Sequence, residues 1–254
     1  MKKNLLALAL GGLLATAAQA DFVRVEAGVG MWNQSVAGDI QYNGNPAFTT
    51  DSLGYDTETK PYAWMYVKHF VPILPNLRLE YAAVEFTGTT TQTFTFNNQT
   101  FAGSTDSTLT MDQLDAILYY NILDNTAWIT VDVGLDIKSM DGQFQANSGT
   151  NTVNETQTII LPLAYGRGRV EIPGTDIGVE AEVKYLGGYK ESKISDMSIK
   201  ADYTLVDIIP FVDLGVEVGY RTQTIELDAT DISSLDTSLG IDVDGVFLGI
   251  VGRF

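Results

Sequence analysis

The sequence predicts an all-β fold: a closed antiparallel up-and-down transmembrane β-barrel of about ten strands. Two observations predict it, namely segments in which apolar residues alternate with other residues and connections that alternate between short and long. A barrel of eight strands is the alternative count, and a soluble periplasmic β-sandwich is the alternative fold. The length of 254 residues suits a single domain of this kind.

Four segments of about nine residues alternate most clearly, and this is the length with which a tilted strand crosses a bilayer. They are Val23–Met31, Ile129–Lys138, Ile177–Tyr185 and Val212–Arg221. Six weaker segments complete the count, at Tyr62–Phe70, Leu77–Phe86, Leu109–Tyr120, Thr158–Val170, Met197–Leu205 and Asp242–Phe254. Pro162 makes Thr158–Val170 the least regular of them, because proline cannot donate a ladder hydrogen bond inside a closed sheet.

The connections between these segments are alternately short and long, as in outer-membrane barrels. Short turns are predicted at Val71–Asn76, Leu123–Thr126, Pro173–Asp176 and Val206–Pro210. Long loops, rich in Thr, Asn, Asp, Ser and Gly, are predicted at Ala37–Lys60, Thr87–Ser107, Met140–Val153, Gly187–Lys193 and Leu227–Gly240. Aromatic residues are expected in two girdles at the membrane interfaces, with Trp32, Tyr62 and Trp64 near the outer one.

The first twenty residues have the features of a cleaved signal peptide. Lys2 and Lys3 precede a short apolar stretch, and Ala18-Gln19-Ala20 offers small residues for cleavage. We therefore expect residues 1–20 to be removed on export and residues 21–254 to form the barrel. The expected location is the bacterial outer membrane, with both termini in the periplasm.

Composition excludes several classes of function. The chain has no cysteine, which excludes disulfides, a thiolate nucleophile and Cys-ligated zinc. Its formal net charge is −17, which argues against nucleic acid as a partner, because phosphate binding needs clustered Lys and Arg. Acidic loops could bind calcium or bridge through divalent cations to lipopolysaccharide, but plain solvation of exposed loops is the favoured interpretation. No cofactor and no metal site are predicted.

The last strand ends in an alternating apolar pattern that closes on Phe254. It resembles the C-terminal signal of proteins assembled into Gram-negative outer membranes, with Phe254, Ile250 and Leu248 facing lipid. This resemblance implies outer-membrane lipid and lipopolysaccharide, the barrel assembly machinery and periplasmic chaperones as partners.

The chain also resembles the small proteobacterial outer-membrane β-barrel family named for a Gly-Gly pair. Three segments carry this resemblance: His69–Pro75, Leu118–Asn125 and Tyr185–Tyr189, which contains Gly187-Gly188. The family implies a fold and a location, and it carries no established activity.

Charged residues on the non-apolar face of the predicted strands form the candidate site. In one interpretation they pair across a narrow lumen and plug it, and in the other they line a narrow, porin-like channel or a small-ligand or transport site. The plug is favoured because about ten strands leave little space. The residues are Arg24, Glu26, Arg78, Glu80, Asp132, Asp136, Lys138, Glu180, Glu182, Lys184, Asp213, Glu217 and Arg221.

No catalytic site is recognisable in the sequence. The single histidine, His69, is predicted at the periplasmic end of the second strand, where a turn contact is more plausible than a general base. The chain is therefore predicted not to be an enzyme, but a barrel with a structural or surface-interaction role.

Overall fold

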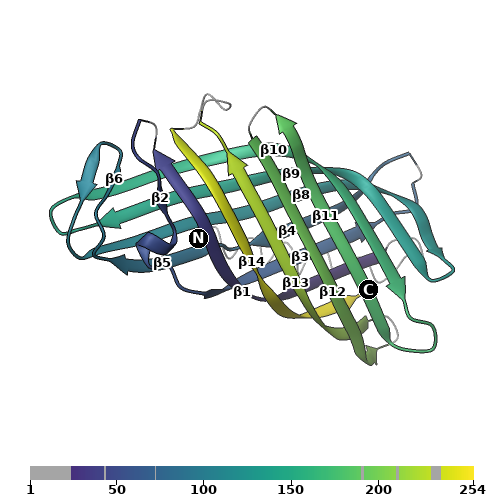
Figure 1. The fold of residues 1–254 in the computed structure, drawn as a ribbon. Helices are drawn as coiled ribbons and strands as arrows, with labels where there is room; N and C mark the ends of the chain where they lie inside the picture. The colour runs from purple at the N-terminus through teal and green to yellow at the C-terminus, as the bar shows by residue number, and fades with distance from the viewer. Residues whose placement is uncertain (1–23, 43, 72, 190–191, 210–211, 230–235) are drawn as a thin grey trace.

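Ten long antiparallel strands form the wall of a barrel in the computed structural model (Figure 1). The structure describes residues 24–42, 44–71, 73–189, 192–209, 212–229 and 236–254. The predicted signal peptide therefore lies outside the described residues. The wall strands are β1 (Arg24–Tyr42), β3 (Glu58–Lys68), β4 (Asn76–Ala82), β8 (Thr105–Thr126), β9 (Ile129–Asn147), β10 (Thr152–Glu171), β11 (Ile177–Tyr189), β12 (Ser192–Ile209), β13 (Val212–Leu227) and β14 (Thr237–Arg253).

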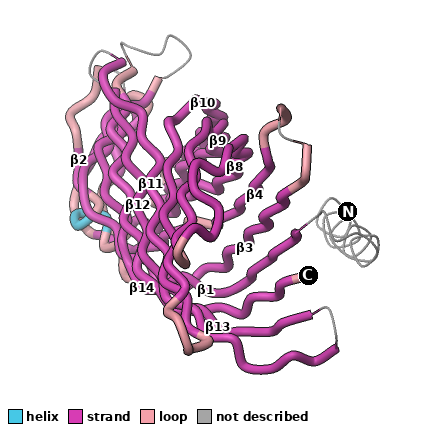
Figure 2. The backbone as a smooth tube through the Cα atoms, turned by 90° about the vertical axis from the view of Figure 1, so that its right-hand side faces the viewer, coloured by secondary structure: helices cyan, strands magenta, loops and turns pink. Residues whose placement is uncertain are grey.

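Pairing between the first and last strands closes the sheet. β1 and β14 are in register from Glu26 opposite Arg253 to Tyr42 opposite Thr237. Beyond that register, the amide of Phe254 donates to the carbonyl of Val25 at 2.8 Å. Figure 2 shows β4, β3, β1, β14 and β13 following one another around this part of the wall. The predicted barrel of ten strands is confirmed, and the count of eight is wrong.

Short turns gather at one end of the barrel, together with the beginning of β1 and the end of β14; we call it the turn end. β8 and β9 are joined through Ala127 and Trp128, both with positive φ, and β10 and β11 through Ile172–Asp176. The turn predicted at Val206–Pro210 is displaced, because β12 continues to Ile209 and residues 210–211 lie outside the described part.

At the opposite, distal end, the strands continue through much of what the sequence suggested were loops. β9 extends to Asn147 and β10 begins at Thr152, so the loop predicted at Met140–Val153 is only a tight connection. β8, β9 and β10 project together beyond the other strands in Figure 1. Four smaller strands pack there: β5 (Glu85–Thr90), which continues β4 along β8, β2 (Phe48–Thr49) and the hairpin of β6 (Phe94–Phe96) and β7 (Gln99–Phe101).

The face that carries apolar side chains changes along individual strands. On β13, Leu214 and Val218 point out of the barrel, whereas Ile225 and Leu227, further from the turn end, are buried inside it. On β14, Leu248 and Ile250 point outward, and Ile241 and Val243 point inward. We call the part with outward apolar side chains the belt section and the part with inward ones the distal section. The distal strands persist because their inner face forms a hydrophobic core.

The position of Pro162 is explained by the unequal length of neighbouring strands. β10 pairs with β11 only from Ala164 to Glu171, whereas it pairs with β9 along almost its whole length. Residues 152–163 therefore form an edge segment, where a proline is tolerated. Along the described residues, no helix is long and apolar enough to cross a membrane.

Candidate functional site

The belt section encloses most of the charged residues that the sequence analysis singled out. Ten of them are buried in the lumen: Glu26, Arg78, Glu80, Asp132, Asp136, Lys138, Glu180, Glu182, Lys184 and Glu217. Arg221 is nearly buried with them. Arg24 is half exposed at the turn end, and Asp213 lies near the same end, opposite Arg253 in the strand register.

An unbroken series of ion pairs begins at the turn end of this lumen. Arg24 contacts Glu26 at 2.7 Å, and Glu26 contacts Arg253 at 3.3 Å. Asp202 then binds both Arg253 and Arg169, each at 2.5 Å. Strands β1, β14, β12 and β10 are thereby joined across the interior by opposite charges.

Glu180 on β11 is the centre of the series. Its carboxylate lies 2.6 Å from Arg167, 3.3 Å from Arg78, 3.5 Å from Lys200 and 3.6 Å from Arg169. A buried carboxylate is tolerated only where such partners replace its hydration. Four cations from three strands therefore share this one side chain, in addition to their other carboxylate partners.

From Arg78, the ion pairs continue toward the distal end. Arg78 contacts Glu80, and Glu80 contacts Lys184. Asp115 then accepts from Lys184 at 2.6 Å and lies 2.8 Å from Lys138. The series ends with Asp196, which lies 3.1 Å from Lys138 and 2.6 Å from Arg221.

Sequence reasoning missed several members of this network. Arg167 and Arg169 lie on β10, where small residues such as Gly166 and Gly168 occupy the outward face, so the usual apolar alternation is weak. The alternation of arginine with glycine in this segment was the sequence signal that could have identified the two arginines as inward residues. Asp196 lies one residue before the predicted start of its strand at Met197, and Arg253 lies beside Phe254 at the end of the apolar pattern of the last strand.

Three aromatic residues lie inside the barrel rather than in the predicted outer girdle. Trp32 and Trp64 are buried, and Tyr62 points its hydroxyl inward. The Trp64 indole N–H and the Tyr62 hydroxyl donate to the same oxygen of Glu217, at 2.9 and 2.7 Å. This part of the prediction is wrong because lumen cations lie against the two indoles: Lys200 Nζ is 4.1 Å from the centre of the Trp64 ring, and the Arg221 guanidinium is 5.2 Å from that of Trp32.

Glycines on β1 make room for these rings. A Cβ at Gly28 would collide with the Trp64 indole, and one at Gly30 would collide with the Tyr62 hydroxyl and the backbone of β14. The two small inward residues of this strand therefore leave room for the aromatic layer formed by Trp32, Tyr62 and Trp64 inside the lumen.

The charged and aromatic layers border a small cavity. A cavity of about 40 Å³ lies among Trp64, Glu217, Arg221 and their neighbours. This volume suits a water molecule or two rather than a solute. Nearby, the fully buried Asp136 has no hydrogen-bond partner on either carboxylate oxygen among the described residues.

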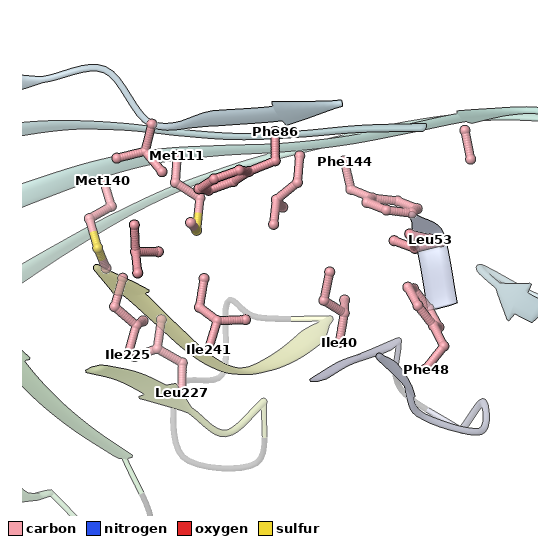
Figure 3. Close-up of a cluster of buried hydrophobic side chains, with 14 of the residues drawn as sticks. Ile40, Phe48, Leu53, Phe86, Met111, Met140, Phe144, Ile225, Leu227 and Ile241 are labelled. Carbon is pink, nitrogen blue, oxygen red and sulfur yellow. The ribbon is translucent and has the colours of Figure 1, made fainter. Parts of the chain in front are cut away.

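The distal section has an interior of a different kind. Phe86, Met111 and Phe144 from one wall face Ile40, Ile225 and Ile241 from the other (Figure 3). Phe48, Phe94, Phe96 and Phe101 come from the small strands β2, β6 and β7 and fill the space between the walls. Aromatic packing joins them, with the rings of Phe96 and Phe144 only 4.5 Å apart.

His69 lies in the turn between β3 and β4. Its Nε2 contacts the carbonyl of Pro75 at 3.0 Å, and its Nδ1 accepts from the amide of Val71 at 3.1 Å. Both ring nitrogens are thus engaged in holding the turn. Within the described ranges, no group of three or more His, Asp or Glu side chains is placed to hold a metal ion.

Comparison with known proteins gives the fold a context. No model of a known protein family matches the chain, and no curated protein matches it. Among solved structures, the outer-membrane protease OmpT of Escherichia coli is similar with a TM-score of 0.53 and 8% identity, over 93% of this chain and 97% of that one. The translocator domain of the autotransporter NalP of Neisseria meningitidis gives a TM-score of 0.43 and 12% identity, over 100% and 98%.

The similarity to OmpT corrects one prediction. The chain was predicted not to be an enzyme, yet the fold that it shares is also the fold of an outer-membrane protease. At 8% identity, the similarity shows the fold alone. The prediction that the chain is not an enzyme is therefore wrong, because neither the barrel fold nor the single histidine justifies it. The architecture itself is that of a bacterial outer-membrane β-barrel.

Proposed function

We propose that this protein is a non-conducting outer-membrane barrel, whose belt section anchors a distal section that interacts with other molecules at the cell surface. The continuous series of ion pairs from Arg24 to Arg221 carries the proposal. It links most of the wall strands through the lumen, and the aromatic layer at Trp64 and Tyr62 lies against it. A solute on this path would have to displace several paired charges together.

The outward face of the belt section supports a place in the membrane. Its side chains are large and apolar on many neighbouring strands, and a water-soluble protein does not expose such a surface. Outer-membrane lipid and lipopolysaccharide are accordingly the proposed partners of this face. Exposed members include Val29, Met31, Leu118, Leu135, Ile137, Ile199, Val218, Leu248 and Ile250.

The end of the chain supports assembly through the outer-membrane route. Leu248 and Ile250 are 63% and 60% exposed on the outer face of β14, and Phe254 follows at the seam with β1. The barrel assembly machinery and periplasmic chaperones would bind this last strand through its alternating outward apolar side chains. Export by the predicted signal peptide would place both termini in the periplasm and the distal section outside.

Membership of the family named for a Gly-Gly pair is part of the proposal. It rests on the segments His69–Pro75, Leu118–Asn125 and Tyr185–Tyr189. The first lies mainly in the turn between β3 and β4, and the second covers the turn end of β8. In other barrels of this family, similar segments would form the corresponding turns.

Single-channel recording tests the closed lumen. The purified protein is inserted into planar lipid bilayers after a gel-mobility shift on boiling has shown that the barrel is folded. We expect no conductance steps, because the ion pairs fill the lumen. Stable, reproducible steps from the folded protein would overturn the proposal in favour of a narrow channel.

A further inference from the structure

A second, larger cavity lies in the distal section, apart from the charged lumen. Its volume is about 200 Å³. A cavity of roughly 150 Å³ with apolar walls is enough to bind benzene, so this one has room for a single ring with a small substituent. Its apolar walls come from both sides of the barrel and from β6, and include Ile40, Leu109, Met111, Phe144, Leu227 and Phe96.

Aromatic rings form part of the cavity wall. Tyr42 and Phe96 meet edge to face with ring centres 5.0 Å apart, and Phe96 contacts Phe144 on the other side. Such groups of rings attract organic cations through their negative faces.

Two carboxylates border the same cavity. Glu155 on β10 and Asp236 before β14 both line it, and neither forms an ion pair with a Lys or Arg of the described residues. Glu155 accepts a hydrogen bond from Asn97. Partial burial and the nearby negative charges of Asp236 and Glu155 raise the pKa of Tyr42.

The rest of the molecule increases this negative character. Nine of the fifteen basic residues lie in the ion-pair network of the belt section: Arg24, Arg78, Lys138, Arg167, Arg169, Lys184, Lys200, Arg221 and Arg253. Few basic residues therefore remain for the distal section, in a chain whose formal net charge is −17. The field around the distal section therefore attracts cations.

Access to the cavity lies beside the free edge of β10. Glu155, Gln157 and Ile159 line it and are each partly exposed, because β11 does not extend along this part of β10. A small molecule could enter here without disturbing the charged lumen.

We propose that the distal cavity binds a small organic cation, an ammonium group attached to an aromatic or branched alkyl body. The body would fill the space among Phe96, Phe144 and Met111, and the ammonium group would lie between the rings and the carboxylates of Glu155 and Asp236. This site does not depend on the lumen being closed, so the conductance experiment and the binding experiment can fail separately.

Calorimetric titration of the folded barrel in zwitterionic lipid nanodiscs tests the proposal. The probe is benzyltrimethylammonium, and benzenesulfonate is the anionic comparison of similar size. We expect saturable binding of the cation and none of the anion. Absence of saturable cation binding, or equal binding of both, would overturn the proposal.

Two variants locate the site. Gly142 lines the cavity, and a Cβ there would meet only the carbonyl of Gln157 at 3.4 Å, so Gly142→Val adds apolar volume at a position where a Cβ has room. We expect it to abolish binding. The double variant Glu155→Gln with Asp236→Asn should weaken binding about tenfold, as expected when two unpaired charges are lost beside a bound cation.

The matched control is Asp39→Asn, which removes a carboxylate from the outward face of β1 next to Ile40. It should leave the affinity within about twofold, since the change in net charge alone has only a screened, long-range effect. All variants are compared only after the gel shift on boiling shows a folded barrel. Unchanged affinity in Gly142→Val would exclude this cavity, and unchanged affinity in the double variant would exclude recognition of the positive charge.

Discussion

The belt section and the distal section are built from the same strands with opposite chemistry. In the belt section, apolar side chains point outward and paired charges fill the interior. In the distal section, Thr and Asp residues point outward, as in the cross-strand pairs Thr158–Asp141 and Thr224–Asp242, each at 2.6 Å. The inner face there is a core of aromatic and aliphatic side chains. The solvent outside the wall, lipid or water, therefore decides which face of a strand is apolar.

Substitutions should also destabilise the two interiors in different ways. A buried ion-pair network is stable only as a set, because removing one member leaves its partners charged and unpaired. A hydrophobic core loses contacts locally when one side chain is truncated. Single substitutions in the two sections test this difference.

Glu180→Gln should have the largest effect. It leaves Arg78, Arg167, Arg169 and Lys200 without their shared carboxylate, and we expect the free energy of unfolding of the whole barrel to fall by about 3–5 kcal/mol. Urea unfolding in detergent micelles, followed by gel mobility, measures the change.

The control for this substitution is Glu226→Gln, which breaks only the long, exposed contact with Lys193 at 3.9 Å. It should cost less than about 1 kcal/mol. Equal urea midpoints for the Glu180 variant and the unchanged protein would show that the network does not stabilise the barrel.

Phe144→Ala should destabilise the distal section and leave the belt section closed. Phe144 packs on Phe48 and Phe96, and truncating a buried phenylalanine costs about 3–4 kcal/mol. Limited proteolysis should then cut near β6 and β7, while the gel shift on boiling persists.

Gln145→Ala is the neighbouring control, on the outward, exposed face of β9. It should leave proteolysis unchanged. If Phe144→Ala instead removed the gel shift on boiling, the two sections would unfold as one unit.

The smallest effect is expected on the outward face, where substitutions at two positions of β13 can be compared. Val218 is 54% exposed in the belt section, and Thr224 lies on the same face in the distal section. An arginine on the lipid face costs about 2–3 kcal/mol, so Val218→Arg should lower the free energy of unfolding in lipid vesicles by that amount. Thr224→Arg should change it by less than about 1 kcal/mol, because the position faces water beside Asp242. Similar costs at both positions would contradict the boundary between the sections.

Much of the barrel was predictable because outward residues of the belt section alternate strictly. The alternation in segments such as Val212–Arg221 predicted both the strand and its inward charged residues, including Glu217 and Arg221. The distal section was harder to predict, because its apolar residues are on the opposite face. Around Gly245 on β14 the alternation changes phase, and Thr-rich stretches beyond such points were interpreted as loops rather than as strands in water.

The all-β class, the approximate number of strands and many of the inward residues follow from the sequence alone, because a period of two assigns side chains to faces without reference to other strands. The tertiary structure sets which charges meet, since contacts such as Arg78 with Glu180 join strands far apart in the chain through the closed wall. It also decided that Trp32 and Trp64 lie inside, and that the apolar residues of the distal strands leave a cavity. These features depend on the stagger of ten strands around a ring, which no single segment encodes.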